Sequence, residues 1–169
     1  MSDDEKSNAE ASTGGNGAAG GGNEPSIHVL VQYLKDFSFE NPNAPMVLQD
    51  QATQPQINVS VNVNATPLGE NMQDFEVDLM IEAKAEANGS AVFAIELHYG
   101  GVFSFQNIPA ENLQPVVLIE GPRLLFPFAR QIISDATRNG GFPPLMLDPI
   151  DFARLYQDRM MQPEAEADS

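Results

Sequence analysis

Residues 74–105 read DFEVDLMIEAKAEANGSAVFAIELHYGGVFSF, and this stretch decides the fold. Apolar and polar residues alternate over residues 74–86, which is typical of a strand with one buried face. Asn88-Gly89 then supplies the two positive φ angles of a tight hairpin turn, and the alternation resumes over residues 90–105. Gly100-Gly101 interrupts the second half and indicates a bulge or a close approach of another segment. The stretch therefore predicts two antiparallel strands.

Two further strands are predicted before this hairpin. Residues 56–64 (QINVSVNVN) alternate without exception between apolar and polar side chains. Residues 26–39 (SIHVLVQYLKDFSF) have some helical spacing, but their β-branched residues and alternating end favour a strand. Three prolines in residues 41–55 predict a crossover loop between these strands, with a short apolar island at Met46-Val47-Leu48.

The sequence after residue 107 has the periodicity of helices. Residues 110–120 (AENLQPVVLIE) predict a short helix interrupted by Pro115, and Gly121-Pro122 predicts a break. Residues 123–138 then carry apolar side chains at helical spacing. Asn139-Gly140-Gly141 is expected to end this helix in the manner of a C-cap.

A last helix is predicted near the carboxyl end. It follows an apolar loop over residues 142–147 (FPPLML). Asp148 is expected to cap it, with Pro149 at its first position, and the helix is expected to end before Pro163. Four strands followed by helices predict an α+β domain, in which a four-stranded antiparallel sheet carries its helices on one side.

The two ends of the chain are too polar to belong to this domain. Residues 1–25 are acidic and Gly-rich and residues 163–169 are acidic, so we expect flexible tails flanking a domain over residues 26–162. The sequence from Gly15 to Gly20 spells G-x-G-x-x-G. It lacks the strand and helix that a nucleotide-binding turn requires, so it is interpreted as chance composition.

The charge of the chain excludes one class of partner and favours another. The formal net charge is −16. Removing five acids and one lysine in residues 1–25, and three acids in residues 163–169, leaves 16 acids and seven bases, a net charge of −9. Such a domain repels phosphate backbones, so nucleic-acid binding is disfavoured. It attracts basic partners, with a strength that falls as the salt concentration rises.

The sequence offers little catalytic chemistry. It contains no cysteine, which excludes disulfides, thiolate zinc sites and cysteine nucleophiles. Its two histidines, His28 and His98, fall in predicted strands, where ordinary surface or packed histidines are expected. No phosphate-binding loop, nucleophile elbow or metal spacing is found, so neither an enzyme nor a cofactor is expected. No segment approaches the ~18 apolar residues of a membrane span, and a soluble cytoplasmic protein is expected.

The apolar loops are candidate binding sites. Their side chains lie between prolines, so they either fill the core beneath the loops or remain available to a ligand. Methionine-rich surfaces suit promiscuous binding, so the second interpretation is a groove for unfolded polypeptide. The residues in question are Met46, Val47, Leu48, Phe142, Leu145, Met146 and Leu147.

A second candidate site is acidic. Side chains alternate between faces along a strand, so Asp36 and Glu40 lie opposite Phe37 and Phe39 in the sequence DFSFE. Glu96 is predicted on the outer face of its own strand. These three acids form a patch only if their strands are neighbours in the sheet, and a solvated surface is the simpler interpretation of each acid alone.

Four spaced motifs are DFSFENPNAP (36–45), ELHYGGVFSF (96–105), LLFPFAR (124–130) and GFPPLMLDPIDFARLY (141–156). Together, and in this order, they resemble SecB, the family of bacterial protein-export chaperones. The resemblance covers residues 26–160 approximately.

The resemblance implies a cytoplasmic homotetramer, arranged as a dimer of dimers. It implies that the protein holds unfolded precursor proteins and delivers them to SecA, the motor of the Sec translocon, without a cofactor or direct membrane insertion. Asp36, Glu40 and Glu96 are then the SecA-binding residues, and the seven apolar loop residues line the polypeptide groove. Ala94 stands near this acidic patch, where relatives often carry a larger apolar residue.

Two alternatives remain on the sequence alone. An acidic adaptor would bind one folded partner through its sheet face. A small hydrolase would depend on His28 or His98. An adaptor should ignore unrelated unfolded chains, whereas a chaperone should bind several of them.

Overall fold

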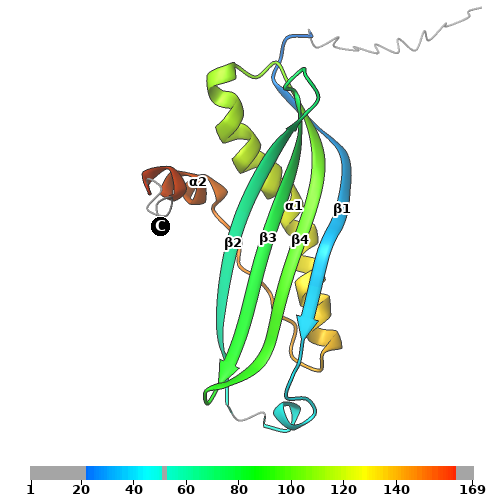
Figure 1. Ribbon diagram of the computed structural model, residues 1–169, viewed down its shortest axis with the longest axis vertical. Helices are drawn as coiled ribbons and strands as arrows, with labels where there is room; N and C mark the ends of the chain where they lie inside the picture. The colour runs from blue at the N-terminus through cyan, green and yellow to red at the C-terminus, as the bar shows by residue number, and fades with distance from the viewer. Residues whose placement is uncertain (1–21, 51–52, 163–169) are drawn as a thin grey trace, which may run out of the picture.

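The computed structural model describes residues 22–50 and 53–162, which form one antiparallel sheet and two helices (Figure 1). The strands are β1 (Ser26–Glu40), β2 (Gln56–Leu68), β3 (Asp74–Ala87) and β4 (Ser90–Gln106). A short 3-10 turn, η1 (Met46–Leu48), lies in the connection between β1 and β2. The helices are α1 (Ala110–Asn139) and α2 (Phe152–Met161). The strand order β1-β4-β3-β2 confirms the α+β fold with a four-stranded antiparallel sheet.

The hairpin of β3 and β4 forms the centre of the sheet. The residues of β3 alternate as predicted, and Val77, Leu79 and Ile81 are fully buried beneath the helical layer. Asn88 and Gly89 have φ angles of 51° and 74°, so the expected turn with two positive φ angles is present. The central strands therefore contribute most of the core.

Helix α1 runs behind the sheet as one continuous element (Figure 1). The predicted break at Gly121-Pro122 is wrong. Gly121 lies against β3, where an added Cβ atom would come within 2.8 Å of a Val77 methyl group. Val117 and Leu125, on either side of this contact, are both buried, so one apolar face continues past the proline. Packing on the sheet outweighs the lost helical hydrogen bond.

Helix α2 begins three residues later than the sequence predicted. Its N-cap is Asp151, whose Oδ1 atom accepts a hydrogen bond from the Arg154 backbone N–H at 3.0 Å. The expected cap at Asp148, with Pro149 as the first helical residue, is therefore wrong. Residues 142–151 instead form an irregular connection, and alternate side chains such as Leu145 and Leu147 pack against the core.

Strand β1 forms one edge of the sheet and is longer than the stretch of β4 that it pairs with. The pairing steps over Leu30 and Lys35, so each of these residues forms a bulge in β1. Gly100 and Gly101 of β4 do not form a bulge themselves, but they allow the close approach that their sequence indicated. An added Cβ atom would lie 2.9 Å from the Tyr33 ring at Gly100, and 3.0 Å from Leu125 at Gly101.

Candidate functional site

The three predicted SecA-binding residues lie on one exposed patch of the sheet. Strands β1 and β4 are neighbours, and their register places Glu40 opposite Ala94 and Ser38 opposite Glu96. Directly opposed residues share a face of the sheet, so Asp36, Glu40 and Glu96 point to the side away from α1. All three acids are exposed. The acidic patch required these two strands to be neighbours in the sheet, and they are.

A charged network lies beside this patch on the same face. The Tyr33 hydroxyl donates a hydrogen bond to Glu76 Oε2 at 2.5 Å, and Lys35 Nζ lies 2.7 Å from Glu76 Oε1. The hydrogen bond from Lys35 lowers the pKa of Glu76, and the same contact raises the pKa of Lys35. Burial, followed by the contact with Glu76, raises the pKa of Tyr33 to about 12. The network connects β1 to β3 across β4.

Asp78 extends the network through one of its carboxylate oxygens. Its Oδ2 atom lies 3.5 Å from Lys35 Nζ and 3.8 Å from His98 Nδ1. The ion pairs formed within residues 22–50 and 53–162 do not include the three patch acids. Lys35 is therefore directed toward the carboxylates of β3, although it is the chain neighbour of Asp36.

The predicted apolar loops meet at one end of the sheet. Figure 1 shows η1 and the carboxyl end of α1 at this same end. Asn41 Nδ2 donates a hydrogen bond to the Gly140 carbonyl at 3.1 Å, which joins the start of the crossover loop to the end of α1. Gly141, with a φ of 92°, lies against Leu48, whose Cδ1 atom would be 3.1 Å from an added Cβ atom.

The apolar loop residues divide into buried anchors and exposed side chains. The Phe142 ring lies 5.2 Å from the ring of the buried Phe93, centroid to centroid. Met46 and Met146 are 71% and 64% exposed. The remaining residues of the predicted groove, Val47, Leu48, Leu145 and Leu147, are half-buried. The set therefore contains side chains that fill the core and side chains that are exposed, and the binding of a ligand by the exposed ones stays a prediction.

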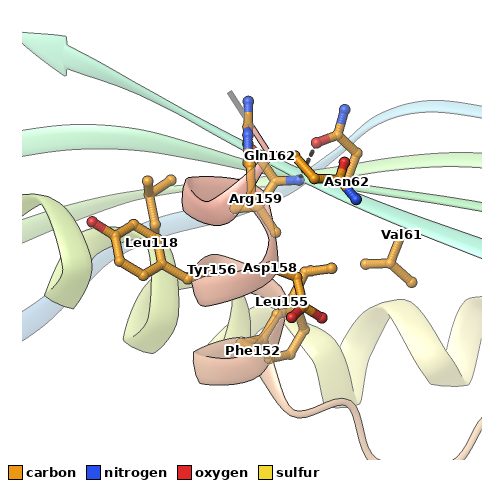
Figure 2. A pocket seen from close by; sticks show the side chains of 10 residues that line it. Val61, Asn62, Leu118, Phe152, Leu155, Tyr156, Asp158, Arg159 and Gln162 are labelled. Atoms are coloured by element: carbon orange, nitrogen blue, oxygen red, sulfur yellow. Dashed lines mark hydrogen bonds between the residues drawn. The ribbon is translucent and has the colours of Figure 1, made fainter. Parts of the chain in front are cut away.

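A hollow that the sequence did not predict lies between α2, α1 and β2. It has a volume of about 370 Å³. Figure 2 shows α2 placing Phe152, Leu155 and Arg159 toward this hollow, where Arg159 Nη1 donates a hydrogen bond to the Val63 carbonyl of β2 at 2.6 Å. The other lining residues are Val61, Asn62, Leu118, Tyr156, Asp158 and Gln162. In the sequence, the helical spacing of Phe152, Leu155 and Arg159 could have indicated that these three side chains share one face of a helix.

Both histidines lie on the outer surface of the sheet. His28 pairs with Ser104 and His98 with Asp36 on the outer face of the sheet, as expected for surface histidines. Residues 22–50 and 53–162 contain no group of three metal-ligating side chains. Over the same residues, neither helix has the length and apolar character needed to cross a bilayer.

The structure is an α+β fold, in which one sheet carries an acidic patch on its outer face and partly exposed apolar loops at one end. The family model described as preprotein translocase subunit SecB matches residues 21–163. The chain belongs to the SecB family, as its sequence motifs indicated. SecB is a chaperone family of protein export and not an enzyme family, so the hydrolase alternative is wrong.

Relatives match most of the chain. It is 59% identical to the protein-export protein SecB of Azorhizobium caulinodans over 146 residues, covering 86% of this chain and 90% of the relative. It is 61% identical to that of Xanthobacter autotrophicus over 138 residues, covering 82% and 87%. The fold is similar to a Mycobacterium tuberculosis SecB-like chaperone solved in complex with a ChAD peptide from the HigA1 antitoxin, with a TM-score of 0.55, 18% identity and coverage of 73% and 90%.

Proposed function

We propose that this protein is a cytoplasmic holding chaperone, which binds unfolded precursors of exported proteins and delivers them to the SecA motor. The observation that carries the proposal is the separation of two surfaces. The apolar loops lie at the end of the sheet where β1 stops, and the acidic patch lies near the same end but on the sheet face away from α1. A client and a motor protein therefore have different places to bind on the same chain.

The apolar loops suit the binding of unfolded chains. Met46 and Met146 present flexible thioether side chains to solvent, and such side chains adapt to many apolar partners. The half-buried Leu145 and Leu147, together with Phe142, fix the loop after α1 to the core, so this part of the binding surface does not have to be assembled from a disordered segment. We propose that Met46, Val47, Leu48, Phe142, Leu145, Met146 and Leu147 line the groove for unfolded polypeptide.

The acidic patch suits a basic partner. Asp36, Glu40 and Glu96 are exposed on adjacent strands, and the neighbouring Lys35 is held by the carboxylates of β3. Electrostatic attraction then accelerates the encounter with a basic partner, and it weakens as salt is added. We propose SecA as that partner.

We further propose that the chain assembles as a homotetramer, arranged as a dimer of dimers. Leu124 and Phe128 of α1 are 40% and 47% exposed, and Val31 and Leu34 of the edge strand β1 are about equally exposed, at 49% and 50%. A contact between copies would cover these apolar side chains. Native mass measurement should give four chains per particle, and a monomer at all concentrations would contradict this assembly.

The client-binding proposal is tested with chemically unfolded chains. The full-length protein is mixed with several urea-unfolded secretory precursors, and their aggregation and complex size are followed by light scattering and gel filtration. A holding chaperone should suppress the aggregation of several unrelated chains. Binding of a single folded partner with no effect on any of them would favour the acidic adaptor instead.

The SecA contact is tested by reversing charges in the patch. Glu40→Lys and Glu96→Lys should weaken SecA binding at least tenfold, because each removes an attraction and adds a repulsion. The matched control is Glu70→Lys, which changes the net charge equally in the turn at the other end of the sheet (Figure 1). Equal losses in all three variants would show that only net charge matters. Loss of client binding together with SecA binding would indicate misfolding.

A further inference from the structure

We propose that Thr137 is a positioning residue for the groove, because it fixes the path of the apolar loop that follows α1. The proposal rests on the proposed function, in which Phe142 and Leu145 to Leu147 form a wall of the client groove. It concerns a buried hydroxyl in the last turns of α1, and this hydroxyl does not itself contact a client.

Two hydrogen bonds connect Thr137 to the loop. Thr137 is fully buried, and its Oγ1 atom accepts a hydrogen bond from the Leu145 backbone N–H at 2.8 Å. Its backbone carbonyl accepts a second from the Phe142 N–H at 3.1 Å. The hydroxyl proton is directed back into the helix, toward the Ile133 carbonyl at 3.1 Å or the Ser134 carbonyl at 3.0 Å. One residue thus holds two points of the loop.

Two prolines separate the residues that form these hydrogen bonds, and they restrict the conformations that the loop can adopt between them. Pro143 and Pro144 have no backbone N–H, so the Leu145 amide is the first donor after Phe142. Each proline also restricts its own φ angle. A short segment with restricted dihedral angles, bound at both ends to the same residue, has little freedom to change direction. The path of the chain from Leu145 onward is therefore set at Thr137.

This path determines which loop side chains face solvent. Leu145 and Leu147 are half-buried against the core, whereas Met146 between them is 64% exposed, with its Sδ atom 3.3 Å from Ser134 Oγ. A wall that is already ordered does not have to be ordered when a client binds, which lowers the entropic cost of binding. Loss of the Thr137 hydroxyl would leave the partly buried Leu145 amide without this acceptor and would release the wall.

Two variants at this position separate the hydroxyl from the packing of the side chain. Thr137→Val keeps the size and branching of the side chain but removes the acceptor for the Leu145 amide. Thr137→Ser keeps the acceptor and removes only the methyl group. Each change removes a different part of a buried side chain, so both proteins are expected to be somewhat less stable than the wild type. Only Thr137→Val should free the loop.

The first measurement is hydrogen exchange of individual amides in the full-length protein. The Leu145 amide should exchange about tenfold faster in Thr137→Val than in the wild type, as expected for the loss of one hydrogen bond. Thr137→Ser should exchange at nearly the wild-type rate at Leu145. The Leu97 amide of β4 reports the global stability of each variant, and the acceleration at Leu145 in Thr137→Val should exceed any change at Leu97. If Thr137→Val does not fold, Thr137→Ala removes the same acceptor. Unchanged exchange at Leu145 in a folded variant without the hydroxyl would overturn the proposal.

The second measurement is affinity for one urea-unfolded precursor, with SecA affinity as the control. Thr137→Val should bind the precursor several-fold more weakly than both the wild type and Thr137→Ser, while SecA binding stays constant. Faster exchange at Leu145 with equal precursor affinity in all three proteins would show that the anchored path has no role in binding, which also overturns the proposal. If the wild type itself binds no precursor, the proposed function is wrong, and the exchange rates still decide whether Thr137 holds the loop.

Discussion

On the helix side of β3, Val77, Leu79 and Ile81 are fully buried beneath α1, whereas on the other side Glu76, Asp78 and Glu82 are at least partly exposed. The two rows of residues belong to the same strand and differ only in the face to which they point. The helix face is held by close packing over many side chains. The outer face is held at a few points, chiefly by the contacts among Tyr33, Lys35 and Glu76.

This difference teaches that the packing that stabilises the domain and the acidic patch proposed to bind a partner lie on opposite faces of one sheet. A change on the helix face alters the packing of the whole domain. A change on the outer face alters charge and leaves the core in place. Substitutions at alternate positions of one strand should therefore have separable effects on folding and on binding.

The largest effect is expected at Leu79. Leu79→Ala leaves a cavity beneath α1, because Leu79 is fully buried, and it should lower the free energy of unfolding by about 2–5 kcal/mol. The control on the exposed face of the same strand, Glu82→Ala, should change it by about 0.5 kcal/mol or less. Urea denaturation measures both. Similar losses in the two variants would contradict the division of the sheet into a packed and an exposed face.

A smaller effect is expected where the outer face is itself packed. Gly100→Ala places a methyl group about 2.9 Å from the Tyr33 ring. The crowding should cost about 1–3 kcal/mol, since the ring is held in place by the hydrogen bond to Glu76. A double-mutant cycle with Tyr33→Ala checks the cause, because the penalty of Gly100→Ala should fall when the ring is absent. Additive losses would show that the ring is not the obstacle.

The smallest effect is expected from the charged network, and it depends on pH. The pKa of Glu76 is lower in the folded protein than in the unfolded chain, so its carboxylate stabilises the fold above the ordinary pKa range of a glutamate. This contribution is lost as the pH falls through the lowered pKa. Glu76→Gln should cost about 1 kcal/mol or less at pH 7, because the pair is partly exposed and screened.

The sign of this effect is checked by denaturing the wild type and Glu76→Gln at several pH values. The difference in stability should shrink below about pH 4 and should also shrink as salt is added at pH 7. A difference that grows as the pH falls would show that the carboxylate opposes folding.

The strands were predictable because their pattern is local. Alternation along residues 74–86 and the Asn88-Gly89 turn require only neighbouring residues, and both are confirmed. The continuity of α1 was not predictable in this way. It depends on the close packing of Gly121 against Val77, which belongs to a strand distant in sequence. The late start of α2 has a similar cause. Asp148 and Asp151 could each cap the helix, and the packing of Leu145 and Leu147 against the core in the irregular connection before α2 favours Asp151.

The candidate sites also divide into one that local sequence could predict and others that depend on residues distant in sequence. The acidic patch followed from strand alternation once β1 and β4 were shown to be neighbours. The hollow beside α2 was missed because its lining comes from three elements that are distant in sequence. The anchoring role proposed for Thr137 could not be predicted from the local sequence either. A threonine within a helical pattern does not indicate that the backbone N–H of Leu145 will donate a hydrogen bond to its hydroxyl.

The bulges at Leu30 and Lys35 divide the pairing of β1 into three short runs. A regular edge strand offers an evenly spaced row of hydrogen-bonding groups, on which another extended chain can grow as a new strand. Interruptions in β1 leave no long, evenly spaced template along its described length. For a protein proposed to work among extended polypeptides, such an edge disfavours the growth of client strands along β1.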